Sequence, residues 1–212
     1  MYKLYYSPAS ASMVVHQALL EIGADHELEL VELAAGGQRD ASYLKLNPLG
    51  VVPTLIIDGK PMFESAAILM ALADRHPQAG LAPLPGSAER NDWYQWIVFL
   101  SNALASTYRF WFYPASLGGD ELTPPERAAL QAKIEGIWDK LDAHLGEHGP
   151  FLLGANFSAA DLLLIMLMRW SRNMPRTALE WPALNRFATL MRTRPSWKEL
   201  YQREGLTDWT GW

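Results

Sequence analysis

The spacing of apolar residues divides the 212-residue chain into a mixed first part and a helical second part. Four short runs are rich in β-forming residues or alternate apolar with polar positions, which predicts strands. These runs cover residues 2–6, 26–31, 54–57 and 61–63. Apolar residues at helical spacing predict one helix that ends at Gly23 and another, apolar nearly all round, that begins at Glu64-Ser65. The β-α-β start predicts a parallel pair of strands with a right-handed crossover.

The second part has a helical pattern throughout. Two of its helices begin with capping-box signals, one at Thr123-Pro124-Pro125-Glu126 and one at Ser158-Ala159-Ala160-Asp161. We expect Asp161 to serve stability rather than chemistry. Proline and glycine gather just before this part, which predicts a linker. The sequence therefore predicts a domain at residues 1–79, a linker at 80–87 and an all-helical domain at 88–212.

Composition and charge narrow the range of functions. The net charge is −5 and no block of lysine or arginine occurs, so we expect no nucleic-acid partner. The most apolar segment, residues 158–168, is too short to span a bilayer, and we see no signal peptide, so we expect a cytoplasmic protein without a membrane partner. The chain has no cysteine, which removes disulfides, thiolate metal sites and a protein thiol nucleophile. We expect no metal, and any thiol chemistry must use a thiol that arrives from outside.

Three motifs, in this order and spacing, resemble the cytosolic glutathione transferase family: Val52-Pro53-Thr54-Leu55, Glu64-Ser65 and Ser158-x-x-Asp161-Leu162. The resemblance covers essentially the whole chain. It implies an α/β plus all-α fold, with an N-terminal thioredoxin-like domain in βαβ-ββα order followed by an all-helical C-terminal domain. It also implies glutathione as co-substrate, a pocket for a hydrophobic substrate in the helical domain, and a homodimer.

The resemblance assigns five residues to glutathione binding. A cis peptide at Val52-Pro53 would let the tripeptide pair there as an added strand, although X–Pro bonds are usually trans and an ordinary edge-strand proline is the alternative. Ser65 would hold the α-carboxylate of the γ-glutamyl group with help from the helix dipole, and Glu64 would help to place its ammonium. Simple helix capping is the alternative for this pair. Gln38 falls where some classes place a histidine that contacts the glycine carboxylate.

The candidate catalytic residue follows the first predicted strand. The stretch Tyr6-Ser7-Pro8-Ala9-Ser10-Ala11-Ser12 resembles the serine-type pattern of the family and maps the catalytic serine onto Ser10. Ser12 and Tyr6 are rival donors, and loop capping is the alternative for all three. In the cysteine-type bacterial pattern the cysteine would fall on Ala11, which argues against thiol–disulfide exchange.

Ser10 is expected to donate a hydrogen bond to the glutathione sulfur and not to act as a nucleophile. No histidine or acid partner is suggested by spacing, so a Ser-His-Asp triad has little support. His16 lies inside the first predicted helix, and we interpret it as a surface or core histidine rather than a base.

Four residues are candidates for the hydrophobic-substrate pocket: Tyr108, Arg109, Trp111 and Phe112. They follow the long helix that flanks this pocket in the family, and aromatic walls suit apolar ligands. A place in the core is the alternative for each aromatic residue. A cation at Arg109 could orient an anionic substrate.

The leading hypothesis is a glutathione transferase that adds the thiolate to a hydrophobic electrophile. A glutathione-dependent isomerase, dehalogenase, lyase or peroxidase would use the same thiolate. A non-catalytic ligand- or protein-binding module on this fold is a third hypothesis, because a fold does not determine a function.

Overall fold

The computed structural model describes residues 1–118 and 121–210, and these residues form two compact units. The first unit contains residues 1–82 together with 191–212, and the second contains residues 83–190. The boundary between 82 and 83 lies inside the range expected to be a linker. Residues 191–212 pack with the first unit, whereas the sequence-based division assigned them to the helical domain.

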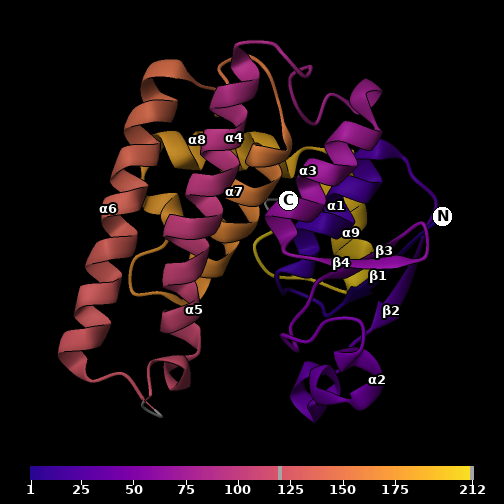
Figure 1. The fold of residues 1–212 in the computed structure, drawn as a ribbon. Coiled ribbons are helices and arrows are strands. Elements are labelled where there is room, and N and C mark those ends of the chain that lie inside the picture. The colour runs from indigo at the N-terminus through magenta and orange to yellow at the C-terminus, as the bar shows by residue number, and fades with distance from the viewer. Residues whose placement is uncertain (119–120, 211–212) are drawn as a thin grey trace. The chain divides into compact units, whose positions relative to one another are not determined.

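The first unit is built on a four-stranded mixed sheet (Figure 1). Its strands are β1 (Tyr2–Tyr6), β2 (His26–Leu30), β3 (Thr54–Ile57) and β4 (Lys60–Phe63), in the order β2-β1-β3-β4. β1 and β2 are parallel, while β3 runs antiparallel to both β1 and β4. All four strands predicted from the sequence are confirmed, and so is the predicted parallel first pair.

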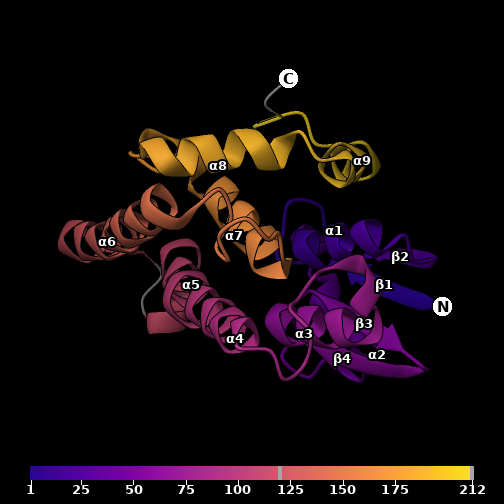
Figure 2. The ribbon, with the colours of Figure 1, turned by 90° about the horizontal axis from the view of Figure 1, so that it is seen from above.

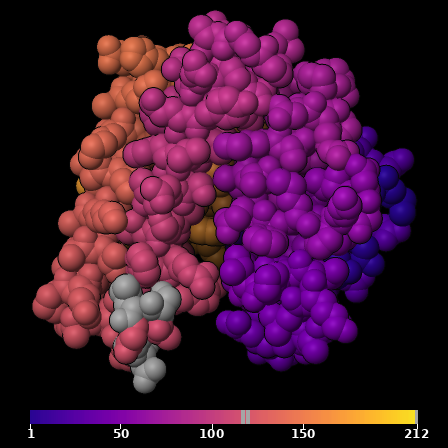
Figure 3. All heavy atoms as spheres, viewed as in Figure 1, coloured from indigo at the N-terminus to yellow at the C-terminus, as the bar shows by residue number. Residues whose placement is uncertain are grey.

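Helices on the first unit complete the βαβ-ββα order. They are α1 (Ser12–Ile22), the short α2 (Ala41–Leu44), α3 (Ser65–Arg75) and α9 (Pro195–Glu204). Helix α1 contacts both α3 and α9, and α9 lies beside α1 in Figure 2. Gly23 ends α1 with a φ of 68°, as predicted for a glycine C-cap. On the face drawn in Figure 3, segments from α2 to α3 form much of the surface of this unit.

The core of the first unit lies between the sheet and the helices. Leu4 and Leu55 from neighbouring strands and Val14 and Leu69 from α1 and α3 are fully buried. A smaller cluster centres on Val31, Tyr43 and Val52. The apolar pattern that predicted α1 and α3 therefore corresponds to the surfaces that these helices bury.

The second unit is helical. It contains α4 (Glu89–Phe99), the π-helical segment η4 (Leu100–Ala105), α5 (Ser106–Phe112), α6 (Pro124–His148), α7 (Ala159–Trp170) and most of α8 (Pro182–Arg192). Helix α7 is buried along nearly its whole length and contacts α4, while α5 contacts α6. The helix start predicted at Thr123-Pro124 is confirmed, and α8 and α9 also begin at prolines, Pro182 and Pro195.

Both predicted capping boxes are present in the second unit. At the start of α7, the Ser158 hydroxyl accepts the Ala160 N–H, and the Asp161 carboxylate accepts the Ser158 N–H at 2.8 Å. Asp161 also accepts the Leu152 N–H at 2.9 Å, so one buried carboxylate joins the helix to the preceding loop. At the start of α6, the Glu126 carboxylate accepts the Thr123 N–H at 2.8 Å.

Candidate functional site

The loop between β1 and α1 carries the three candidate donors. The Ser10 N–H donates to the Ser7 carbonyl and the Ser10 carbonyl accepts the Met13 N–H, so the loop turns directly into the helix. Ala9 has a φ of 62°, in the left-handed region that a residue with a Cβ rarely adopts. Its N–H donates to the Glu204 carboxylate at 3.0 Å, which holds the loop to α9.

Two serine hydroxyls meet inside this loop. The Oγ atoms of Ser10 and Ser12 lie 2.8 Å apart, and both can donate to the Ser7 carbonyl, at 2.7 Å and 3.0 Å respectively. Ser12 is fully buried and accepts the Ser7 N–H, whereas Ser10 is half-buried. Of the two serines, only Ser10 therefore keeps some exposed surface. If its proton turns to a ligand, the Ser12 hydroxyl can still satisfy the Ser7 carbonyl.

Tyr6 is the third candidate and lies at the end of β1. Burial raises the pKa of its phenol, and the negative charges of Glu204 and Glu32 raise it further. The phenol is therefore protonated at neutral pH and can donate a hydrogen bond, but it is a poorer acid than an exposed tyrosine. Its ring meets the edge of the His16 ring, with centroids 6.2 Å apart.

The loop before β3 carries Val52 and Pro53, and the peptide bond between them is cis. Two buried side chains support this loop. The Tyr43 hydroxyl and the Asn47 amide both donate to the Val51 carbonyl, at 2.7 Å and 2.8 Å. Val52 takes no part in the loop and turn hydrogen bonds found within the described residues.

Glu64 and Ser65 stand at the start of α3, as predicted. Glu64 is the exposed N-cap residue, with a φ of 72°, and its side chain makes no capping bond. The Ser65 hydroxyl donates to the Ala11 carbonyl at 3.3 Å. This contact joins the start of α3 to the loop that carries Ser10, so two of the predicted groups of site residues lie together.

Gln38 lies in a short 3-10 turn, Gly37–Arg39, and its position differs from that of the other candidates. Its side-chain oxygen is buried and has no hydrogen-bond partner within the part of the chain that the structure describes. Among the same residues, no hydrogen bond links the Gln38 side chain to the Ser10 loop or to Glu64 and Ser65. The Gln38 backbone lies against Gly50, in the loop that leads to Val52.

The four candidates of the second unit all lie on α5 but differ in burial. Tyr108 is fully buried and Trp111 nearly so, whereas Arg109 and Phe112 are exposed. The Tyr108 ring stacks on Phe112, with centroids 5.6 Å apart, and contacts Trp170 edge-on at 5.9 Å. Burial raises the pKa of the Tyr108 phenol far above its ordinary value. Tyr108 and Trp111 thus pack inside this unit, and Arg109 and Phe112 offer side chains at its surface.

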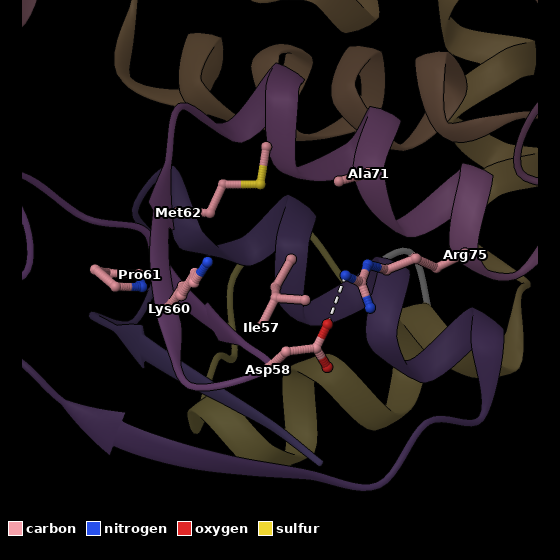
Figure 4. A pocket seen from close by; sticks show the side chains of 7 residues that line it. All are labelled: Ile57, Asp58, Lys60, Pro61, Met62, Ala71 and Arg75. Atoms are coloured by element: carbon pink, nitrogen blue, oxygen red, sulfur yellow. Dashed lines mark hydrogen bonds and ion pairs between the residues drawn. The ribbon is translucent and has the colours of Figure 1, made fainter.

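A surface hollow of about 430 Å³ lies elsewhere on the first unit (Figure 4). Residues of β3, β4 and α3 line it, and the Arg75 guanidinium donates to the Asp58 carboxylate at 2.7 Å. Both side chains of this pair are largely exposed. None of the predicted site residues lines this hollow.

Within residues 1–118 and 121–210, no three histidine or acidic side chains gather so that they could hold a metal ion. Over the same ranges, no helix is long and apolar enough to cross a membrane.

Sequence reasoning missed Glu204. It belongs to α9, at the far end of the chain, yet its carboxylate reaches both Ala9 and His16. No local pattern reports such a contact, because the partners are separated by most of the sequence. The sequence offers one local signal for this contact: Glu204 is an acidic residue on the face of α9 that is buried.

The sheet order, the cis-proline loop before β3 and the helical second part define a thioredoxin-like domain joined to an all-helical domain. Family models agree with this division. Residues 4–80 match the glutathione S-transferase N-terminal domain, and residues 124–212 match the glutathione S-transferase C-terminal domain.

Individual relatives agree as well. Glutathione S-transferase GST-4.5 of Xanthomonas campestris is 30% identical over 96% of this chain and 99% of its own. A sphingomonad glutathione S-transferase, solved in complex with glutathione, is 30% identical over 97% of this chain and 100% of its own, with a TM-score of 0.84. The maleylacetoacetate isomerase of Dictyostelium discoideum is 31% identical over 75% of this chain and 74% of its own.

The chain therefore belongs to the glutathione S-transferase family, with glutathione as its co-substrate. The predicted fold class is confirmed.

Proposed function

We propose that this chain is a glutathione transferase in which the Ser10 hydroxyl stabilises the thiolate of bound glutathione for attack on a hydrophobic electrophile. One observation carries the proposal. Ser10 is the half-buried member of the serine pair, and its proton can turn outward because Ser12 can satisfy the Ser7 carbonyl in its place. The absence of cysteine and the alanine at position 11 favour an incoming thiol activated by a hydroxyl.

Glutathione is an extended tripeptide, and the candidates match its parts. The Val52 backbone would pair with the cysteinyl residue. Ser65 and the N-terminus of α3 would hold the α-carboxylate of the γ-glutamyl group, and Glu64 its ammonium. Gln38 would reach the glycine carboxylate. The Ser65–Ala11 hydrogen bond supports a single site, since it links the γ-glutamyl end to the loop where the sulfur would lie.

The energetic demand on Ser10 is modest. A thiol with a pKa of about 8.5 is only a few per cent ionised at pH 7. Lowering that pKa by about two units is worth roughly 2.7 kcal/mol and makes most of the thiol a thiolate. A hydrogen bond to a charged sulfur contributes about 1.5–3 kcal/mol, which is of the required size. The rest of the acceleration must come from holding the electrophile beside the sulfur.

The electrophile would lie against α5. Arg109 and Phe112 are the exposed candidates, so they would contact the substrate, while Tyr108 and Trp111 would shape the wall from within. In the transfer step the sulfur electron pair forms a bond to the electrophilic carbon. The bond from that carbon to the leaving group breaks, and the leaving group takes the bonding electron pair. Arg109 would stabilise a negative charge that builds up on the substrate.

Isomerisation is the second candidate function, and the Dictyostelium discoideum isomerase favours it. The same thiolate would add to a carbon–carbon double bond, allow rotation and then leave, so that glutathione is regenerated. We also propose a homodimer, as is typical of the family, and a cytoplasmic location, where glutathione forms the main thiol pool.

A direct test combines binding with turnover. Calorimetry with glutathione should give saturable heat, and an aryl halide should yield the glutathione thioether, detected by mass. Ser10→Ala should retain binding and lose most turnover, while Ser42→Ala, an exposed serine on α2, should match the parent protein. Absence of heat at millimolar glutathione would contradict the proposal, and so would full turnover by Ser10→Ala.

A further inference from the structure

Glu204 is the last residue of α9, and its side chain has no exposed surface. Its two carboxylate oxygens have different partners. One accepts the Ala9 N–H at 3.0 Å, and the other lies 2.9 Å from His16 Nδ1. The second contact is a hydrogen bond between the carboxylate and the imidazole, and the tautomer of His16 sets which atom donates. Glu204 thus joins the serine loop to helix α1.

A buried carboxylate of this kind is costly unless it is hydrogen-bonded. The loop gains from the same bonds, because Ala9 adopts a left-handed conformation that is unfavourable for a residue with a Cβ. The hydrogen bond from the Ala9 N–H to the carboxylate opposes rotation of that peptide out of this conformation. Because Ser10 follows directly, the direction of its hydroxyl depends on the same peptide.

Helix α9 is also tied to α1 at a second place, away from the loop. The Glu21 carboxylate accepts two hydrogen bonds from the Arg194 guanidinium, at 2.7 Å and 2.8 Å. Gln17 donates to the Ser196 hydroxyl close by, at 3.2 Å. The Glu204 contacts and the Glu21–Arg194 contact both hold α9 against the rest of the first unit. Of these two, the Glu204 contacts alone reach the loop that carries Ser10. The chain therefore supplies its own control for the effect of docking alone.

We propose that Glu204 is a positioning residue, which holds the Ala9 backbone and His16 so that the Ser10 hydroxyl points at the glutathione sulfur. This inference rests on the proposed function, since it gives Glu204 a role in the same site. Glu204 touches neither glutathione nor the electrophile in this account. It acts through two neighbours, Ala9 in the loop and His16 on α1.

The test measures two properties of each variant. Thiolate absorbance of bound glutathione, followed against pH, gives the pKa of the bound thiol. Exchange of the Ala9 amide proton, followed by NMR, reports the loop without needing glutathione. Kinetic constants are measured alongside, because loss of positioning should lower kcat more than it raises the KM for glutathione.

Glu204→Ala should raise the bound-thiol pKa by about one unit, which from a starting pKa about two units below 8.5 is about threefold less thiolate at pH 7. It should also remove the protection of the Ala9 amide. Glu204→Gln should rescue both properties, since its amide oxygen can accept the Ala9 N–H and its amide N–H can donate to His16 Nδ1 once the imidazole carries its proton on Nε2. Glu21→Ala should loosen α9 and leave the bound-thiol pKa and the Ala9 protection unchanged.

Three results would overturn the proposal: an unchanged bound-thiol pKa in Glu204→Ala, an equal rise in Glu21→Ala, or no rescue by Glu204→Gln. If the alanine variant does not fold, Glu204→Asp decides, because the shorter side chain keeps the charge and cannot reach both partners. An unchanged bound-thiol pKa in that variant would also refute the role. If the parent protein binds no glutathione while its Ala9 amide is protected, the proposed function fails although the loop contact exists.

Discussion

Helices α7 and α3 both begin near a serine and an acidic residue, yet the two ends are built differently. At α7, Ser158 is the N-cap residue, and its hydroxyl and the Asp161 carboxylate accept backbone N–H groups of the helix start. At α3, Ser65 is already inside the helix, and its hydroxyl donates outward to the Ala11 carbonyl. The exposed Glu64 makes no capping bond.

The position of a serine relative to the first helical turn therefore distinguishes a helix end capped by its own side chains from one whose N–H groups have no side-chain cap. A serine one residue earlier closes the end, whereas a serine one residue later leaves the N–H groups for an anion. The lack of a side-chain cap does not by itself indicate a ligand-binding helix end, because α4 also lacks one. The start of α3 differs from the start of α4 because its Ser65 hydroxyl contacts the loop that carries Ser10.

We expect the largest loss of stability at the start of α7, where Ser158 and Asp161 form a capping box. Asp161→Ala removes a fully buried acceptor of the Ser158 and Leu152 N–H groups and should lower the free energy of unfolding by about 3 kcal/mol. Urea denaturation measures this loss. Glutathione affinity of the folded protein should be unchanged. A loss below about 1 kcal/mol would mean that the box adds no more than an exposed cap.

At the start of α3, which has no side-chain cap, we expect a large effect on glutathione binding and a small effect on stability. Ser65→Ala should weaken glutathione binding by about tenfold or more, the value of a hydrogen bond to a carboxylate. The free energy of unfolding should change by less than about 1 kcal/mol, since the bond to Ala11 is long. Titration calorimetry and denaturation together test this contrast. If Ser65→Ala were instead strongly destabilising with unchanged glutathione affinity, Ser65 would serve the stability of α3, as Ser158 serves that of α7.

The box at the start of α6 should give the smallest effect, because Thr123 and Glu126 are exposed. Thr123→Ala should cost about 1 kcal/mol at neutral pH. Hydrogen bonds from Thr123 lower the pKa of Glu126, so this stabilisation is present above the unfolded pKa and disappears as the pH falls through the lower, folded pKa. Denaturation at neutral and acid pH should show the difference shrinking in acid. A constant difference would contradict the linkage.

Features with local causes could be predicted from the sequence. The four strands, the glycine that ends α1 and both capping boxes depend on neighbouring residues, and the structure has each of them. The cis bond at Val52-Pro53 was expected from the resemblance and not from local chemistry, because isolated X–Pro bonds are mostly trans.

Features with distant causes could not be predicted. The Glu204–Ala9 contact joins residues near opposite ends of the chain, and the packing of residues 191–212 with the first unit has the same origin. Burial within the aromatic stretch also depends on tertiary packing. Tyr108 is enclosed while Phe112, one helical turn later, is 41% exposed. Aromatic composition alone does not distinguish these two cases.

If the Ser10 hydroxyl stabilises the thiolate, it lowers the pKa of the bound thiol. The most direct measurement is the thiolate absorbance of bound glutathione against pH in the parent protein, Ser10→Ala and the Ser42→Ala control. The account predicts a pKa below the ordinary value of about 8.5 in the parent and the control, and a rise of about one to two units in Ser10→Ala. An unchanged pKa in Ser10→Ala, with a rise in Tyr6→Phe instead, would contradict it.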